Sequence, residues 1–109
     1  MKVFKFGGAS VKDARGIRNL AEITAGEKDK LVVVVSAFGK TTNALEQVLK
    51  TWMAGDEGYK SLLDNIYNYH DSVARALFPG GNSAKGRIDN TFAFLREYLE
   101  SAKKDGYDF

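Results

Sequence analysis

The N-terminal part of the chain has the hydrophobic pattern of two strands separated by a helix. Residues 3–6 alternate apolar side chains with lysine and stop at Gly7-Gly8, which predicts a short strand that ends at a turn. Residues 31–35 are an uninterrupted apolar run, which predicts a strand covered on both faces, as in parallel sheets. Between them, apolar positions within residues 10–25 recur at helical spacing, with Ser10 and Asp13 as possible caps. This order predicts a parallel sheet, a right-handed crossover and helices packed against the sheet.

The rest of the chain has the period of helices. Asn43, with Glu46 three residues later, predicts the cap of a helix that ends near Gly55. Two longer helices follow, and their apolar stripes are Leu62, Ile66, Tyr69, Val73 and Leu77 in the first and Ile88, Phe92, Leu95 and Leu99 in the second. Pro79-Gly80-Gly81 separates them, so we expect a helical hairpin beside the sheet. Gly106 ends the last helix, and residues 107–109 look like the entry to another strand.

Composition and charge argue against several kinds of protein. Sixteen Lys and Arg residues against fourteen Asp and Glu leave a net charge of +2 without a basic block, which argues against nucleic acid as a partner. The absence of cysteine excludes disulfides and thiolate chemistry, and a single histidine argues against a polyhistidine metal site. No segment has the pattern of a secretory signal or the length of a membrane span. We therefore expect a cytoplasmic protein that has no membrane partner.

The first candidate site is the turn after the first predicted strand, Lys5-Phe6-Gly7-Gly8-Ala9-Ser10. Glycines lack a Cβ, so their backbone N–H groups can approach a phosphate closely, and the beginning of a helix adds unsatisfied donors and a positive field. Lys5 would add a full positive charge. From the spacing alone, a plain strand-to-helix turn with a surface lysine explains the segment equally well.

The second candidate site is the loop after the second predicted strand. Ser36, Thr42 and Asn43 place polar side chains where a buried strand emerges, and ligands of α/β proteins usually bind beyond the carboxyl ends of the strands. If the two strands are neighbours, the two loops share one crevice. The alternative is that Thr42 and Asn43 only cap the following helix.

Within this loop, Gly39-Lys40-Thr41 precedes a predicted helix, as the end of a P-loop does. A P-loop also requires a glycine five positions before the one that precedes its lysine. That position is Val34, inside the predicted strand, so we reject a P-loop.

Other conspicuous residues favour a structural role. His70 lies beside an apolar helix stripe, which favours packing over catalysis. Residues 79–86 favour a flexible helix–helix connection over an anion-binding loop, because no strand precedes them. We expect Trp52 and Met53 to pack in the core or between domains. Lys103 and Lys104, at a helix end, are expected to interact favourably with the helix dipole.

The two candidate segments together resemble the signatures of the aspartate kinase family. Residues 5–11, Lys-Phe-Gly-Gly-Ala-Ser-Val, resemble the family's opening signature Lys-Phe-Gly-Gly-Thr-Ser-Val. Val33-Val-Val-Ser36-Ala37 through Thr42-Asn43 resembles its second signature, at a matching spacing. The resemblance covers the whole chain, strongly to about Leu45 and more loosely through the helical hairpin. It departs at Ala9, where the family usually has threonine, so a hydroxyl is not available at that position.

The resemblance implies an α/β fold of the amino acid kinase type, a three-layer sandwich around a parallel sheet, here truncated and with a helical hairpin insertion. Aspartate kinases are several times longer. Residues 1–109 would thus be the N-terminal part of the catalytic domain, without the rest of that domain and without the regulatory ACT domains. The family's substrate-binding glutamate follows the strand that begins at Tyr107 and would lie outside this chain. We therefore expect the chain alone to be inactive.

The activity that the resemblance implies is the ATP-dependent phosphorylation of the side-chain carboxylate of L-aspartate, the committed step toward lysine, threonine and methionine, by a homo-oligomeric enzyme. Lys5 would contact the transferring phosphoryl group, and Thr42 would bind aspartate. The phosphate site would contain four further residues, Gly7, Gly8, Ser10 and Ser36. Magnesium would be held largely by the phosphates, with no metal ligand from this chain. Two alternatives stay open: another amino acid kinase with a different acceptor, and a non-catalytic interaction domain built on the helical hairpin.

Overall fold

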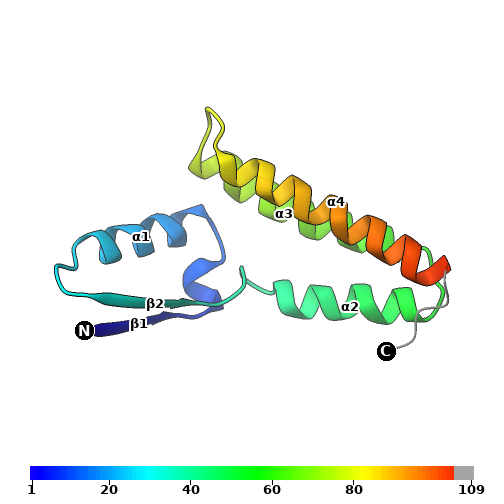
Figure 1. The fold of residues 1–109 in the computed structure, drawn as a ribbon, viewed down its shortest axis with the longest axis horizontal. Coiled ribbons are helices and arrows are strands. Elements are labelled where there is room, and N and C mark those ends of the chain that lie inside the picture. Colours follow the sequence, from blue (N-terminus) through cyan, green and yellow to red (C-terminus); the bar gives the residue numbers. More distant parts are fainter. Residues whose placement is uncertain (105–109) are drawn as a thin grey trace. The chain divides into compact units, whose positions relative to one another are not determined.

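The two strands of the N-terminal part lie side by side and parallel, as predicted. In this computed structural model, which describes residues 1–104, β1 (Lys2–Phe6) pairs with β2 (Leu31–Val35). A 3-10 helix, η1 (Gly8–Val11), and helix α1 (Ala14–Ala25) connect them, and three helices follow: α2 (Thr41–Met53), α3 (Tyr59–Leu77) and α4 (Ser83–Lys104) (Figure 1). The chain divides into two compact units, Met1–Thr42 and Asn43–Phe109. The predicted strand at 107–109 and the helix end at Gly106 lie outside the described residues.

Helix α1 begins where one of its two predicted caps lies. The carboxylate of Asp13 accepts a hydrogen bond from the backbone N–H of Gly16 at 2.8 Å, so Asp13 is the cap. Ser10 is not a cap of α1. It lies within η1, where its N–H donates to the carbonyl of Gly7 at 3.0 Å, because the chain makes a 3-10 turn before α1 starts.

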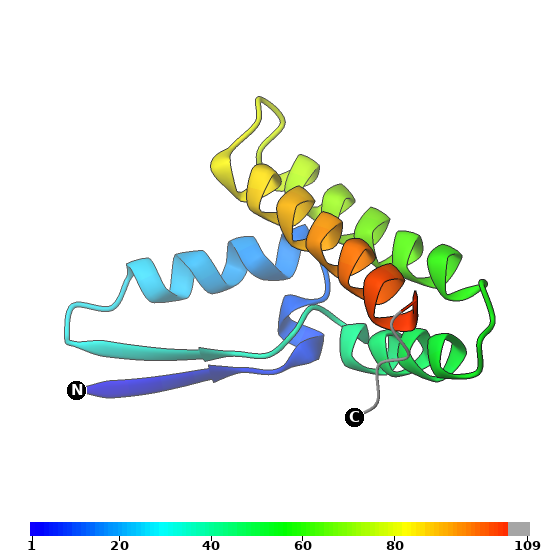
Figure 2. The same ribbon diagram turned by 45° about the vertical axis from the view of Figure 1, so that its right-hand side comes forward.

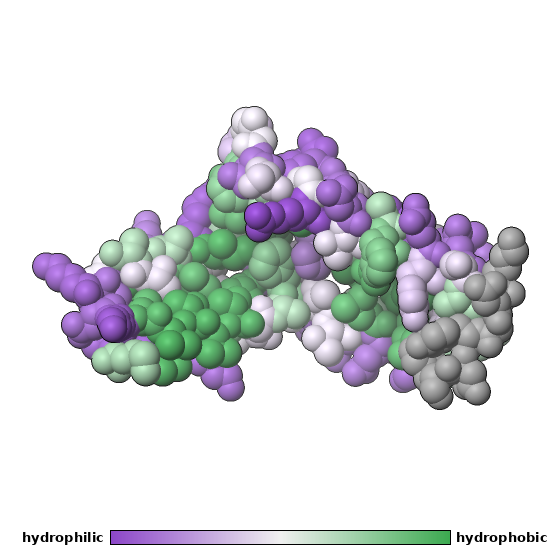
Figure 3. All heavy atoms as spheres, viewed as in Figure 1, coloured by the Kyte–Doolittle hydropathy of each residue, from purple (hydrophilic) through white to green (hydrophobic). Residues whose placement is uncertain are grey.

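The apolar side chains of β2 are more exposed than the sequence predicts. Val32 and Val34 are 44% and 47% exposed, while Val33 and Val35 are 38% and 49% exposed. Because successive side chains of a strand point to opposite faces, both faces are open and the prediction of a covered strand is wrong for the described chain. The sheet has two strands in the described residues, with α1 running alongside it (Figure 2). Figure 3 shows the resulting hydrophobic surface over the strands.

Helix α2 begins two residues before the predicted cap at Asn43. The N–H of Thr41 donates to the carbonyl of Phe38 at 3.0 Å, and the Thr41 hydroxyl donates to the same carbonyl at 2.5 Å. These two bonds close a turn ahead of Asn43, which therefore lies inside the first turn of the helix. The predicted end is confirmed, since α2 stops at Met53 and Gly55 adopts a positive φ of 76°.

The predicted helical hairpin is confirmed as α3 packed on α4. The indole N–H of Trp52 donates to the carbonyl of Leu99 at 2.9 Å, which ties α2 to α4 within the core. On α3, Tyr59 and Leu63 are buried more deeply than the predicted stripe, although both lie beside it on the helix surface. The core of this unit consists of Val48, Trp52, Tyr59, Leu63, Ile66, Phe92 and Ala102.

Two of the residues with a predicted structural role are packed as expected. Trp52 is buried, and His70 is half-buried, with its Nδ1 2.9 Å from the carbonyl of Ile66 and its ring 5.7 Å from that of Phe92. Met53 is not in the core, because its side chain is 63% exposed. None of the helices within residues 1–104 is long and apolar enough to cross a membrane.

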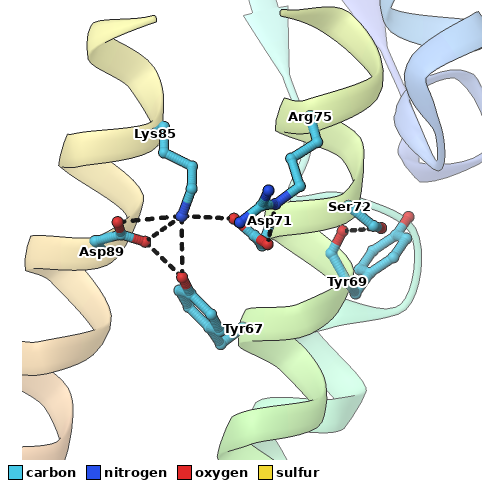
Figure 4. A network of polar contacts seen from close by, with 7 residues as sticks. All are labelled: Tyr67, Tyr69, Asp71, Ser72, Arg75, Lys85 and Asp89. Carbon is cyan, nitrogen blue, oxygen red and sulfur yellow. Dashed lines mark hydrogen bonds and ion pairs between the residues drawn. The ribbon is translucent and has the colours of Figure 1, made fainter. Parts of the chain in front are cut away.

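A polar network joins α3 and α4 near the turn of the hairpin (Figure 4). The Lys85 ammonium lies 2.7 Å from Oδ1 of Asp71 and 3.0 Å from Oδ1 of Asp89, and it donates to the Tyr67 hydroxyl at 3.2 Å. Arg75 donates to Oδ2 of Asp71 at 2.7 Å. Hydrogen bonds from Lys85 and then Arg75 hold the pKa of Asp71 below its ordinary value of 3.8, and the same carboxylates raise the pKa of Lys85.

Candidate functional site

The first predicted site segment forms the turn at the end of β1. Phe6 is the last strand residue, and Gly7 follows in an extended conformation with φ −78° and ψ 174°. Gly8 then opens η1, which is anchored by Val11, a side chain only 1% exposed. The burial of Val11 thus stabilises the turn through which the chain leaves the sheet.

The second predicted site segment leaves the sheet at the same edge. The N–H of Ser36 donates to the carbonyl of Phe6 at 3.1 Å, so the first residue after β2 is bonded to the last residue of β1. The loop then turns at Gly39, whose φ of 50° lies in the left-handed region that glycine adopts without strain. The expected convergence of the two segments at the carboxyl ends of neighbouring strands is therefore confirmed.

The contact between the two segments is a close approach of backbone. A Cβ built on Gly8 would lie 3.0 Å from the carbonyl oxygen of Gly39, closer than most side-chain Cβ atoms come to a neighbour. A side chain at position 8 would thus need the two loops to move apart by a few tenths of an ångström. Gly7 is different, because a Cβ at that position would meet nothing within 4 Å and its φ is negative. Within the described residues, neither packing nor backbone conformation therefore requires a glycine at position 7.

The charge at this edge of the sheet is positive. Lys5 lies one residue before the end of β1, opposite Val34, and is exposed. Lys40 is exposed in the loop after β2. No ion pair to either lysine occurs within residues 1–104, so both ammonium groups are available to an anion.

The hydroxyl groups near this edge differ in their availability. Ser10 and Ser36 are exposed, on η1 and directly after β2. Thr41 is 8% exposed and donates its hydroxyl to the carbonyl of Phe38, so it serves the fold. Thr42 is exposed in the first turn of α2, and it is not the cap that the alternative explanation assumed. Of the two adjacent threonines, Thr42 is the one a ligand can reach.

Two features of this site were not predicted from the sequence. The glycine of the second segment, Gly39, was expected there, but not its close approach to Gly8. Lys40 was considered only as part of a P-loop, although it is a second exposed cation beside Gly39. A glycine followed by lysine in a short strand-to-helix loop was the available signal. As for metals, no group of three or more acidic or histidine side chains within residues 1–104 is placed to hold an ion.

Fold and site together define an α/β protein whose candidate ligand site is a cationic, glycine-containing edge at the carboxyl ends of two parallel strands. The sequence profile of the amino acid kinase family matches residues 1–91. The chain belongs to this family.

Relatives with curated names are aspartate kinases. The chain is 34% identical over 102 residues to the bifunctional aspartokinase/homoserine dehydrogenase 2 of Arabidopsis thaliana, a chloroplastic protein, with 91% of this chain and 11% of the relative covered. It is 36% identical over 87 residues to aspartokinase 2 of Bacillus subtilis, with 77% of this chain and 21% of the relative covered. The chain thus spans about a tenth of the plant relative and about a fifth of the bacterial one. The resemblance to aspartate kinases noted from the signatures is confirmed.

Proposed function

We propose that the complete protein carrying this chain is an aspartate kinase, which transfers the γ-phosphoryl group of ATP to the side-chain carboxylate of L-aspartate. The observation that carries the proposal is the meeting of the two signature segments at one edge of the sheet, through the Ser36–Phe6 hydrogen bond and the close approach of Gly8 to Gly39. The names of the relatives support the choice of acceptor. The product, aspartyl phosphate, would enter the synthesis of lysine, threonine and methionine.

The chemistry of this transfer needs charge and positioning more than acid–base catalysis. A free aspartate carboxyl has a pKa near 3.9, so it is already an anionic nucleophile at neutral pH and needs no general base. Its oxygen forms a bond to the γ-phosphorus while the bond from that phosphorus to the bridging oxygen of ADP breaks, and ADP leaves with that oxygen. The rate then depends on donors and cations that hold the phosphoryl oxygens in place.

Six residues of the site have a role in this proposal. Lys5 contacts the transferring phosphoryl group with its ammonium. The phosphate oxygens accept hydrogen bonds from backbone and hydroxyl donors of four residues, Gly7, Gly8, Ser10 and Ser36. Thr42 binds the aspartate, and magnesium arrives with ATP, held through the phosphate oxygens. Residues 1–109 are, in this view, the N-terminal part of the catalytic domain, which supplies one wall of the site and is inactive alone.

The test is to identify the product made by the complete gene product. With ATP, magnesium and hydroxylamine present, aspartyl phosphate is trapped as the hydroxamate, and each candidate acceptor is supplied in turn. We expect hydroxamate with aspartate. Hydroxamate with another carboxylate but none with aspartate would overturn the choice of substrate and leave the family intact. Binding of ATP without phosphorylation of any small acceptor would favour a non-catalytic role.

A further inference from the structure

The loop after β2 carries a charge that the proposed site does not use. Lys40 is exposed, and no ion pair to it occurs in the described part of the chain. It directly follows Gly39, whose carbonyl oxygen would lie 3.0 Å from a Cβ at position 8. Lys40 is therefore the next residue in the chain after the point at which the two site segments approach each other.

The position of Lys40 is unfavourable for the stability of the isolated fold. It directly precedes the first residue of α2, Thr41, and the N-terminal end of a helix favours anions and disfavours cations. No carboxylate among residues 1–104 is paired with it, and Lys5 adds a second unpaired cation at the same edge of the sheet. A polyanion bound there would turn both charges into favourable interactions.

Two cations on two different segments, Lys5 in β1 and Lys40 in the loop after β2, match an extended polyanion better than a compact one. The triphosphate of a nucleotide carries several negative charges along a chain of linked phosphates, so different phosphates can contact the two lysines. The aspartate substrate carries two carboxylates and one ammonium group, so its net charge is only about −1 at neutral pH. The chemistry thus favours the nucleotide as the ligand of Lys40.

We propose that Lys40 is a second cationic contact for the polyphosphate of the nucleotide, a binding residue that sets the affinity for ATP. This inference rests on the proposed function, because it places a further residue in the same site. Lys5 acts on the phosphoryl group that is transferred, while Lys40 holds the part of the polyphosphate that does not change during the reaction. Loss of Lys40 therefore weakens ATP binding and leaves the chemical step largely intact.

The experiment compares Lys40→Met with Lys28→Met and Lys40→Arg in the complete gene product. Lys28 is a matched control, because it is an exposed lysine of the same unit in the loop before β2, at the opposite end of the strand from Lys40. Binding of ATP and of inorganic tripolyphosphate is measured by titration calorimetry without aspartate, and hydroxamate formation gives the Michaelis constants. Thermal melting of each variant checks that it is folded.

We expect Lys40→Met to weaken both ATP and tripolyphosphate binding by about tenfold, a typical effect of losing one charge-assisted contact. The KM for aspartate should stay constant, Lys40→Arg should restore most of the affinity, and Lys28→Met should bind as the wild type does. Unchanged binding by Lys40→Met would overturn the inference and leave the proposed function standing. Failure of the wild type to bind ATP would overturn both. Normal ATP binding by the wild type without aspartyl hydroxamate would overturn only the proposed reaction.

Discussion

The ammonium group of Lys85 on α4 lies 2.7 Å from a carboxylate oxygen of Asp71 on α3. Together with the hydrogen bond from the Tyr67 hydroxyl to Oδ1 of Asp89 at 2.6 Å, this ion pair joins the two helices in the polar network of Figure 4. The Lys85 and Asp71 side chains are 29% and 16% exposed. Oδ1 of Asp71 is buried among the described residues, and the ammonium of Lys85 neutralises it. The stability of the hairpin near its turn should therefore depend on this one lysine.

Lys85→Met should lower the melting temperature of the protein, because two carboxylates and a tyrosine hydroxyl lose their shared partner at a partly buried position. Lys60→Met is the matched control on α3. Lys60 pairs with Glu57 at 3.0 Å, but both side chains are more than half exposed, so its loss should matter much less. Equal melting temperatures for the two variants, measured by circular dichroism, would contradict a special role for Lys85.

The same network predicts how stability depends on pH. The pKa values of Asp71 and Asp89 are lowered in the folded protein, the first mainly by Lys85 and the second mainly by Tyr67. The stability that such carboxylates contribute is complete when the pH is above their ordinary pKa of 3.8. This contribution is lost as the pH falls from 3.8 through the lower pKa values of the folded state. Lys85 has the opposite sign: its contribution is complete below 10.5 and is lost only at higher pH.

Thermal melts between pH 2.5 and 7 check this dependence. The wild type should lose stability steeply below about pH 4. Lys85→Met should lose less over the same range, because without Lys85 the pKa values of Asp71 and Asp89 are lowered less in the folded protein. A variant whose melting temperature falls in parallel with the wild type would show that other carboxylates dominate the acid response.

Gly7→Ala and Gly8→Ala should change different properties, the KM for ATP in the first case and stability in the second. A methyl group at position 7 meets nothing within 4 Å, so Gly7→Ala should fold normally and raise the KM for ATP, because it blocks the approach of phosphate to the backbone. At position 8 the methyl lies 3.0 Å from the Gly39 carbonyl, so the loops must shift by a few tenths of an ångström and stability should fall. A normal KM for ATP in a well-folded Gly7→Ala enzyme would remove Gly7 from the phosphate site.

Thr42→Val should raise the KM for aspartate and leave that for ATP nearly constant, because the exposed hydroxyl is assigned to the amino acid. Thr41→Val is a useful comparison one residue away. Its hydroxyl is bonded to the Phe38 carbonyl, so its loss should lower the melting temperature and change neither KM selectively. A change in the KM for ATP alone in Thr42→Val would move Thr42 to the phosphate site.

The local order of elements was predictable from the sequence, because alternation, helical period and caps such as Asp13 are short-range signals. The start of α2 was not. Asn43 has the better capping side chain, but the bonds of Thr41 to Phe38 depend on how the preceding loop folds. The exposure of both faces of β2 was also not predicted. A run of valines indicates a strand that is normally buried on both faces, but it does not show whether the described residues include the elements that bury it.

The candidate site was predictable in outline, because both signature segments follow strands and parallel neighbours bring their carboxyl ends together. Sequence could not separate the roles of adjacent residues. Thr41 and Thr42 are chemically identical, and Gly7 and Gly8 are too, yet one of each pair serves the packing of the loops and the other faces open space. That distinction depends on backbone geometry that only the folded loops define.

The proposed function is tested most directly by the turnover of Lys5→Ala in the complete gene product, measured as aspartyl hydroxamate formed from ATP and aspartate. We expect the wild type to form hydroxamate and Lys5→Ala, with an unchanged melting temperature, to turn over about a hundredfold more slowly, because one preorganised charge on the transferring phosphoryl group is lost. Its KM for aspartate should change little. A wild-type turnover number in folded Lys5→Ala would contradict the account, and so would a wild type that forms no aspartyl phosphate.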